Sequence, residues 1–233
     1  LKQITLAIAF LMALTTSVFS QDFNKGLAAA QTGDFATALQ EWRPLAEQGD
    51  ASAQFNLALM YSNGMGVLQD DAEAAKWYLR AAEQGNASAQ NNLGLMYRKG
   101  NGVLQDDAEA AKWYLRAAEQ GNASAQNNLG LMYRKGNGVL QDDAEAVKWF
   151  RMAAEQGDAQ AQTNLGFMYH YGKGVLKDNT MAHMWYNIGS ANGNDLGAEN
   201  REIVAKEMTS EDISKATALA RECMSSNYQK CGY

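Results

Sequence analysis

A repeat of 36 residues in the middle of the chain constrains its fold more than any other feature. Residues 66–101 recur without a single change at 102–137, and weaker copies flank this pair. All five tryptophans share one position of the repeat, at intervals of 35 and then three times 36 residues: Trp42, Trp77, Trp113, Trp149 and Trp185. Self-similarity with this period indicates a repeat architecture. Because one such unit cannot bury its own apolar face, stacked copies are needed to form a continuous core.

Each repeat is predicted to be a pair of helices. Residues 87–99 carry apolar side chains at helical spacing, and residues 108–120 do the same around Trp113 and Tyr114. Alanine is abundant and Pro44 is the only proline, which favours helices over a β-fold. The predicted fold class is therefore all-α, a superhelical solenoid of stacked helical hairpins.

The segment between the two helices of a repeat is predicted to be a turn. Gly100 ends the first helix, since glycine readily adopts the left-handed conformation found there. Asp106 or Asp107 is expected to cap the second helix and to interact favourably with its dipole. Val103 and Leu104 are expected to plug the turn with apolar side chains.

The repeat closely resembles a known family. Four copies match the string AxxQGxAxAQxxLGxMYxxGxGVxxDxxxAxxWxxxAA, which is similar to the Sel1-like repeat, a longer-looped relative of the tetratricopeptide repeat. Residues 22–49 resemble a shorter, tetratricopeptide-like variant. The resemblance implies an α/α superhelix that scaffolds protein complexes. For exported bacterial members it implies a role at the cell envelope or in dealings with a host.

One cysteine-rich branch of that family is described as penicillin-binding or β-lactamase-like and carries a cysteine pair in every repeat. This chain lacks those cysteines and contains no S-x-x-K motif, so we predict that it is not an enzyme. The alternative is a β-lactamase-like or peptidoglycan-related hydrolase.

The repeats divide the chain into segments. The first unit lacks the long loop, and Pro44 is expected to kink or break its second helix, so it is interpreted as a capping hairpin. After Gly193 the repeat fades, and a helix near 196–206 and a last helix beginning after Thr209 or Ser210 are expected. The predicted segments are a signal peptide (1–20), a tetratricopeptide-like N-terminal cap (21–49), four Sel1-like repeats (50–85, 86–121, 122–157 and 158–193) and a C-terminal helical cap (194–233).

The N-terminus has the pattern of a secretory signal peptide. Lys2 precedes an apolar run from Ile4 to Leu14, and a small, polar stretch ends at Ser20. A membrane-spanning helix needs about 20 apolar residues, and this run is shorter. An uncleaved anchor or an ordinary buried helix is the alternative. We expect cleavage before Gln21 and an exported protein, periplasmic or secreted, that is not stably inserted in a membrane.

Two cysteines lie eight residues apart near the C-terminus, Cys223 and Cys231. In an oxidising compartment such a pair forms one disulfide. A zinc half-site or a redox pair is the alternative, but the spacing is not C-x-x-C and no histidine lies nearby.

Composition and motifs argue against several classes of ligand. The formal net charge is −6 and lysine and arginine are not clustered, which disfavours nucleic acid as a partner. No motif for a cofactor is found, and His170 and His183 are interpreted as surface or packing residues rather than as metal ligands. The four Gly-x-Gly turns are interpreted as helix ends rather than as a phosphate cradle.

Comparison of the copies predicts where a partner binds. Solenoids usually bind along the concave surface, which the first helix of each hairpin lines in related folds. Packing residues must repeat, whereas solvent-facing residues need not, so we interpret the two most variable positions of these helices as exposed. They are seven residues apart and share a face. This predicted stripe comprises Phe55, Asn91, Asn127 and Thr163 at one position and Ser62, Arg98, Arg134 and His170 at the other.

We predict that the stripe contacts an extended peptide or protein segment. Arg98 and Arg134 would pair with its carboxylates, the asparagines would hydrogen-bond its backbone, and Phe55 would be an apolar anchor. The alternative is a solvated helix face without a partner. The invariant asparagines of the repeat, such as Asn92, either point into the groove or hydrogen-bond the neighbouring hairpin. The predicted function is an exported interaction scaffold, and a secreted factor that acts on a host is a further alternative.

Overall fold

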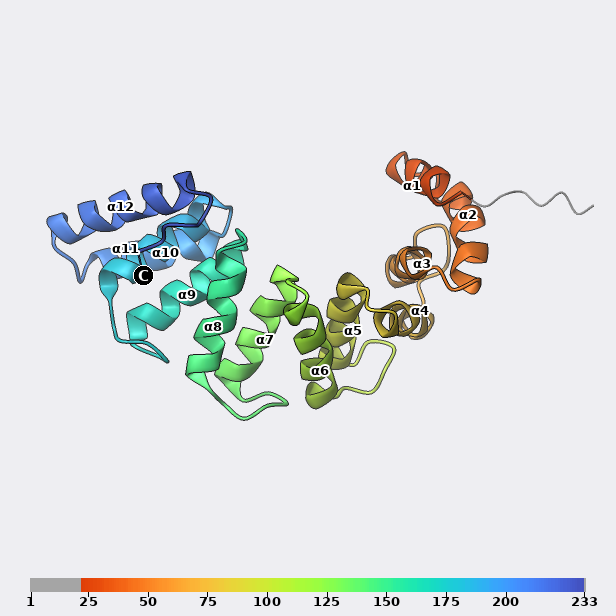
Figure 1. The fold of residues 1–233 in the computed structure, drawn as a ribbon, viewed down its shortest axis with the longest axis horizontal. Coiled ribbons are helices and arrows are strands. Elements are labelled where there is room, and N and C mark those ends of the chain that lie inside the picture. Colours follow the sequence, from red (N-terminus) through yellow and green to blue (C-terminus); the bar gives the residue numbers. More distant parts are fainter. Residues whose placement is uncertain (1–21, 233) are drawn as a thin grey trace, which may run out of the picture.

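The computed structural model describes residues 22–232, and in this part of the chain all regular structure is helical. Ten helices form five successive hairpins, and two further helices follow the last hairpin. Figure 1 shows that the hairpins follow one another along an arc, with α1 at one end and α12 at the other. The bounds are α1 Phe23–Gln31, α2 Phe35–Glu47, α3 Ala51–Asn63, α4 Asp71–Glu83, α5 Ala87–Lys99, α6 Asp107–Glu119, α7 Ala123–Lys135, α8 Asp143–Ala154, α9 Ala159–Tyr171, α10 Asn179–Ala191, α11 Asp195–Ala205 and α12 Ser210–Ser225. The predicted fold class, an α/α solenoid, is confirmed.

The helices begin and end at the residues that local chemistry favours. Gly100 follows α5 in the left-handed conformation, with φ of 72°, and its N–H donates to the carbonyl of Met96 at 2.8 Å. The Asp106 carboxylate accepts from the N–H of Glu109 at 2.9 Å and so caps α6. Of the two predicted caps it is therefore Asp106 that acts, and Asp107 is the first helical residue.

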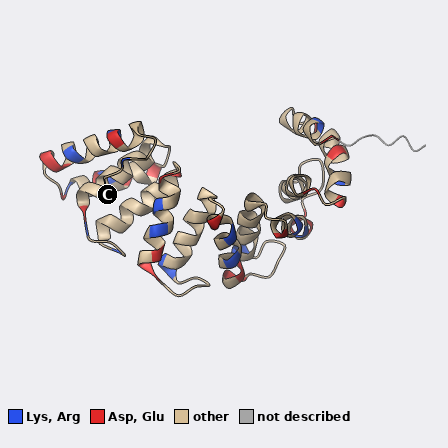
Figure 2. Cartoon of the chain, in the orientation of Figure 1, with Lys and Arg blue, Asp and Glu red and all other residues tan. Residues whose placement is uncertain are grey.

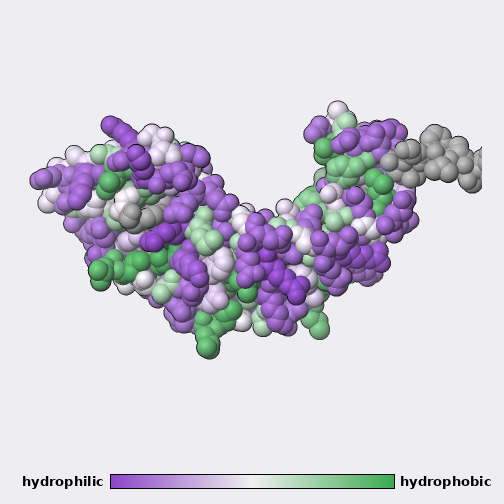
Figure 3. Space-filling view, viewed as in Figure 1, coloured by the Kyte–Doolittle hydropathy of each residue, from purple (hydrophilic) through white to green (hydrophobic). Residues whose placement is uncertain are grey.

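The turn between the two helices of a repeat is plugged by only one of the two predicted residues. Val103 is partly buried against the core of the N-terminal repeats, whereas Leu104 is 90% exposed. The expectation for Leu104 is therefore wrong. Four leucines at this position are equally exposed: Leu68, Leu104, Leu140 and Leu176. The α5–α6 and α7–α8 loops run along the outer edge of the arc (Figure 1), where Figure 3 shows hydrophobic protrusions.

The second glycine of each Gly-x-Gly turn has a role beyond ending a helix. A Cβ atom on Gly102 would lie 2.1 Å from the carbonyl oxygen of Asp71, at the start of the preceding α4. Gly138 meets Asp107 in the same way, also at 2.1 Å. These glycines therefore let the loop of one repeat pack directly on the backbone of the repeat before it.

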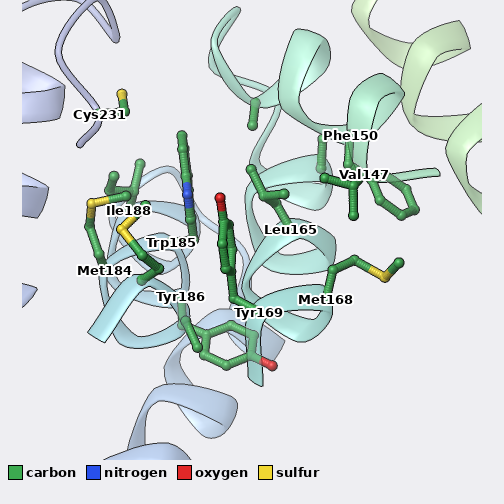
Figure 4. Close-up of a cluster of buried hydrophobic side chains, with 14 of the residues drawn as sticks. Val147, Phe150, Leu165, Met168, Tyr169, Met184, Trp185, Tyr186, Ile188 and Cys231 are labelled. Carbon is green, nitrogen blue, oxygen red and sulfur yellow. The ribbon is translucent and has the colours of Figure 1, made fainter. Parts of the chain in front are cut away.

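A glycine inside α5, α7 and α9, the first helices of the last three repeats, gives similar close packing in the core. Gly130 in α7 lies under the ring of Phe150 in α8, and a Cβ there would be 2.7 Å from Cε1 of that ring. Gly94 and Gly166 stand in the same relation to Tyr114 and Tyr186. Figure 4 shows the core of the last repeats, in which Phe150 and Leu165 are among the buried side chains. Aromatic rings from the second helices thus fill space that these glycines leave open.

A buried glutamine joins three helices at each junction between repeats. The Gln90 side chain in α5 donates to the carbonyl of Ala82 in α4 at 2.9 Å, and its oxygen accepts from Gln120, the residue that follows α6, at 2.7 Å. The same pattern recurs around Gln54, Gln126 and Gln162. Because these amides lie in the core and have partners, they fix the register of successive hairpins.

Helix α2 runs through Pro44 to Glu47. Of the two outcomes expected for Pro44, a kink or a break, the break is wrong, because the proline lies in the last turn of α2 and the helix continues beyond it to Glu47. At the other end, Thr209 caps α12 through a hydrogen bond from the N–H of Asp212 at 3.2 Å.

The C-terminus is joined to α12 by a disulfide between Cys223 and Cys231, as predicted. Both cysteines are buried in the core of the last repeats. Closing a loop of this length lowers the conformational entropy of the unfolded chain, which raises the free energy of unfolding by about 2–3 kcal/mol. We therefore expect reduction, or replacement of both cysteines by alanine, to lower the free energy of unfolding by about that amount. Urea titration followed by circular dichroism measures this; equal midpoints with and without reductant would contradict it.

Candidate binding surface

The first position of the predicted stripe lies on the first helices of the repeats, but its exposure changes along the chain. Phe55 in α3 and Asn91 in α5 are half-buried. Asn127 in α7 and Thr163 in α9 are buried, with 7% and 5% of their surfaces exposed. The Asn127 oxygen accepts from Asn164 at 2.8 Å. The expectation that Asn127 and Thr163 face solvent is therefore wrong.

The second position shows the same trend. Ser62 and Arg98 are half-buried, as is Arg134, whose guanidinium lies 5.1 Å from the ring centroid of Phe167. His170 is only 6% exposed. It stacks on Tyr171 with ring centroids 4.5 Å apart, and its Nε2 lies 3.6 Å from a Glu207 carboxylate oxygen.

The prediction that His170 is exposed is thus also wrong, because the C-terminal cap covers the last repeat. Glu207 follows α11, and its carboxylate lies beside His170 near the end of α9. The accessible part of the stripe is therefore restricted to α3, α5 and α7, with Phe55, Ser62, Asn91, Arg98 and Arg134.

The invariant asparagines link neighbouring hairpins. The Asn128 amide donates to Asn91 at 3.1 Å, and Asn164 donates to Asn127. At the first junction Phe55 stands in place of such an acceptor, and the Asn92 amide instead donates to the hydroxyl of Tyr78 at 3.1 Å. Of the two roles that the sequence left open for these asparagines, the structure shows the hydrogen bond to the neighbouring hairpin.

A pocket of about 260 Å³ opens beside the stripe, between α3 and α5. Leu59, Leu95 and Met96 form apolar walls, and the hydroxyls of Ser62 and Tyr78 also line it. Asp71 and Lys99 are its charged groups. The sequence analysis did not predict this pocket. A signal was present, however, because Ser62 is short where the next two repeats have arginine, and most other residues that line the pocket recur in the next repeat.

The electrostatics of the pocket vary between junctions. Burial raises the pKa of Tyr78, and hydrogen bonds with Ser62 and Asn92 partly oppose this rise. Burial raises the pKa of Tyr114 at the next junction to about 12, with the Arg98 guanidinium opposing it. Burial also lowers the pKa of Arg134, and attraction to Asp143 opposes that shift. Over the whole arc, basic and acidic residues are interspersed (Figure 2).

Within residues 22–232, none of the helices combines the length and apolar character needed to cross a bilayer. No group of three or more histidine, cysteine, aspartate or glutamate side chains is arranged as metal ligands would be within this range. His170 and His183 are both buried, in α9 and α10. The predicted signal peptide lies outside the described residues.

Comparison with known proteins gives consistent results. The family model described as Sel1 repeat matches residues 51–86, 87–122, 123–158 and 159–194. A protective antigen present in uropathogenic Escherichia coli strains, displaying an SLR fold, is similar with a TM-score of 0.82 and 36% identity; the match covers 88% of this chain and 46% of that one. A Sel1 repeat protein from Oxalobacter formigenes is similar with a TM-score of 0.70 and 31% identity, over 91% of this chain and 93% of that one. No curated protein matches the chain.

Stacked hairpins with accessible first helices define the class of α/α solenoid repeat proteins, which present extended surfaces to partners. The four matched segments cover more than half of the sequence, and the chain belongs to the Sel1 repeat family. Proteins of this family are generally scaffolds for protein–protein interaction rather than catalysts. The chain spans less than half the length of the E. coli antigen it resembles.

Proposed function

We propose that this protein is an exported scaffold that binds an extended peptide or protein segment along α3, α5 and α7. The observation that carries this proposal is the row of accessible, chemically varied side chains on successive first helices, next to a pocket. Phe55 offers an apolar contact, Asn91 offers an amide, and Arg98 and Arg134 offer cations for carboxylates of the partner. Asn127, Thr163 and His170 are not part of the proposed contact surface, because they are buried.

Export is supported by three independent features. The N-terminal sequence has the pattern of a signal peptide. Cys223 and Cys231 form a disulfide, which is typical of oxidising compartments. A similar protein is a protective antigen of uropathogenic E. coli strains. Fractionation of cells that produce the protein tests this directly, and we expect it in the periplasm or the culture medium.

Release into the medium would favour the second candidate, a factor that acts on a host. The observation in its favour is the likeness to that antigen, which is described as protective. Retention of all protein in the periplasm would count against this candidate while leaving the scaffold proposal intact.

The binding surface is tested by cross-linked capture from the envelope fraction. The stripe variant carries alanine at Phe55, Asn91, Arg98 and Arg134. A matched control carries four substitutions on the outer edge, where serine replaces the exposed leucines at Leu68, Leu104, Leu140 and Leu176. Circular dichroism first establishes that both variants have the helical content and thermal midpoint of the wild type.

We expect a partner that the wild type and the edge variant capture and that the stripe variant loses by at least about tenfold, as when central contacts of an interface are truncated. A photo-cross-linking residue in place of Asn91 should join the same partner, and one in place of Lys112 on α6 should not. Loss in the edge variant with retention in the stripe variant would place binding on the outer edge and refute the proposed surface.

A further inference from the structure

The pocket between α3 and α5 has a counterpart one repeat further on, between α5 and α7. Because residues 66–101 and 102–137 are identical, both junctions receive the same residues from the loop and the two helices that follow. Among the residues that line the pocket, only two contributed by α3 differ from those of α5. Ser62 stands where α5 has Arg98, and Asn63 stands where α5 has Lys99.

At the second junction, the chain's own Arg98 covers the equivalent site. Tyr114 is fully buried and Met132 is 2% exposed, whereas their counterparts Tyr78 and Met96 are 3% and 7% exposed. The hollow that remains at the second junction is lined by Arg98 itself and Met132 but no longer by the tyrosine. Ser62 is too short to give the same cover, and its hydroxyl donates to the carbonyl of Leu59 at 3.1 Å.

The first junction is also short of positive charge. It retains the carboxylate of Asp71, which corresponds to Asp107 at the second junction, but Ser62 and Asn63 replace two cations. Lys99 in the pocket corresponds to Lys135 at the second junction, where Arg98 and Lys135 line the same hollow. A lysine at this place is therefore compatible with a guanidinium beside it. The first junction therefore has the space and the negative charge of Asp71 to receive one more cationic side chain.

Arginine fits these surroundings in shape and in charge. Its aliphatic stem matches the walls formed by Leu59, Leu95 and Met96, as long basic side chains commonly cover apolar surface. Its charge is matched by the Asp71 carboxylate, which lines the pocket. At the second junction neither Asp107 Oδ1 nor the Tyr114 hydroxyl has a hydrogen-bond partner although Arg98 lies beside them, so the likeness between the two sites is one of charge and shape.

We propose that this pocket receives an arginine side chain of the bound partner, in the place that Arg98 holds one repeat further on. This inference rests on the proposed function and specifies the partner's chemistry. The partner segment carries an arginine at the α3–α5 junction and carboxylates about one repeat further along, opposite Arg98 and Arg134.

A titration with a small probe tests the pocket without any partner. N-acetyl-arginine amide is added at millimolar concentration to protein labelled at asparagine side-chain amides. We expect saturable NMR shifts of Asn63 and Asn92, which line the pocket, and none at Asn164. N-acetyl-citrulline amide, which lacks the charge, should bind at least about tenfold more weakly, since hydrogen bonds to charged groups are the stronger ones. Equal shifts with both probes, or no shifts, would overturn the proposal.

Substitution of Ser62 tests the occupant. Ser62→Arg installs the residue that α5 carries at this position, so the variant should fold normally and should abolish the shifts. Ser62→Ala leaves the pocket open and should keep them. Asp71→Asn removes the carboxylate and should weaken binding by at least about tenfold. Unchanged binding in the Ser62→Arg variant would refute the assignment.

Peptide selection then separates this inference from the proposed function. Random ten-residue peptides displayed on phage are selected on the wild type. We expect arginine at one fixed position and loss of the selected peptides in the Ser62→Arg variant. Peptides that depend on Arg98 but lack arginine would overturn the pocket assignment and support the scaffold. Saturable arginine binding with no peptide selected would support the pocket and count against the scaffold.

Discussion

Replacing Gly138 with alanine is expected to destabilise the solenoid by about 3 kcal/mol or more, because two separate costs coincide. The residue has φ of 67°, a conformation that costs an L-residue with a side chain about 1–2 kcal/mol. The new Cβ would also lie 2.1 Å from the carbonyl oxygen of Asp107 and 2.2 Å from its carbon. Both atoms belong to the backbone at the start of α6, so no side-chain rotation relieves the clash, and such overpacking costs about 1–3 kcal/mol or more.

Gly121 provides the matched control for this substitution. It has φ of 88°, but a Cβ there would meet nothing within 4 Å. Gly121→Ala should therefore lose only the conformational part, about 1–2 kcal/mol. Urea unfolding of both variants, followed by circular dichroism, measures the difference. Equal losses would show that the loop of one repeat does not rest on the preceding helix as closely as described.

The features that the sequence predicts well are those set by residues close together in the chain. The helix boundaries follow from caps such as Asp106 and from left-handed glycines such as Gly100, and both act within a few residues. All five tryptophans are buried, as their regular place among apolar residues at helical spacing indicates. By contrast, the contact of Gly138 with Asp107 joins residues 31 positions apart, and nothing in the local pattern reveals it.

The binding stripe was only partly predictable, because variation between copies has two physical causes. Residues of the last repeat differ from their counterparts where they pack against the C-terminal cap. A Cβ on Gly189 would lie 2.6 Å from the Thr163 hydroxyl oxygen, and one on Gly197 would lie 3.1 Å from it, so Thr163 fits between α10 and α11. His170 faces Glu207 in the same way. Variation at a terminal repeat therefore reflects capping, whereas variation at Ser62 leaves an open pocket.

The contact of Phe150 with Gly130 predicts that the effect of Gly130→Ala on the free energy of unfolding changes sign when Phe150 is replaced by alanine. Phe150 is fully buried, and Phe150→Ala should cost about 3–5 kcal/mol through lost burial and the cavity left behind. In the wild-type background, Gly130→Ala should cost about 1–3 kcal/mol, because its Cβ would lie 2.7 Å from the Phe150 ring.

Once the ring is removed, the added methyl group at position 130 no longer meets it and occupies part of the cavity. Alanine also favours the helix over glycine by about 1 kcal/mol. We therefore expect Gly130→Ala to be neutral or stabilising in the Phe150→Ala background, although the carbonyl of Ala146 remains 3.2 Å from the new Cβ. Thermal and urea unfolding of the four proteins gives the coupling energy. Strictly additive losses would mean that the glycine serves the flexibility of α7 and not the packing of the ring, since only direct contact couples the two substitutions.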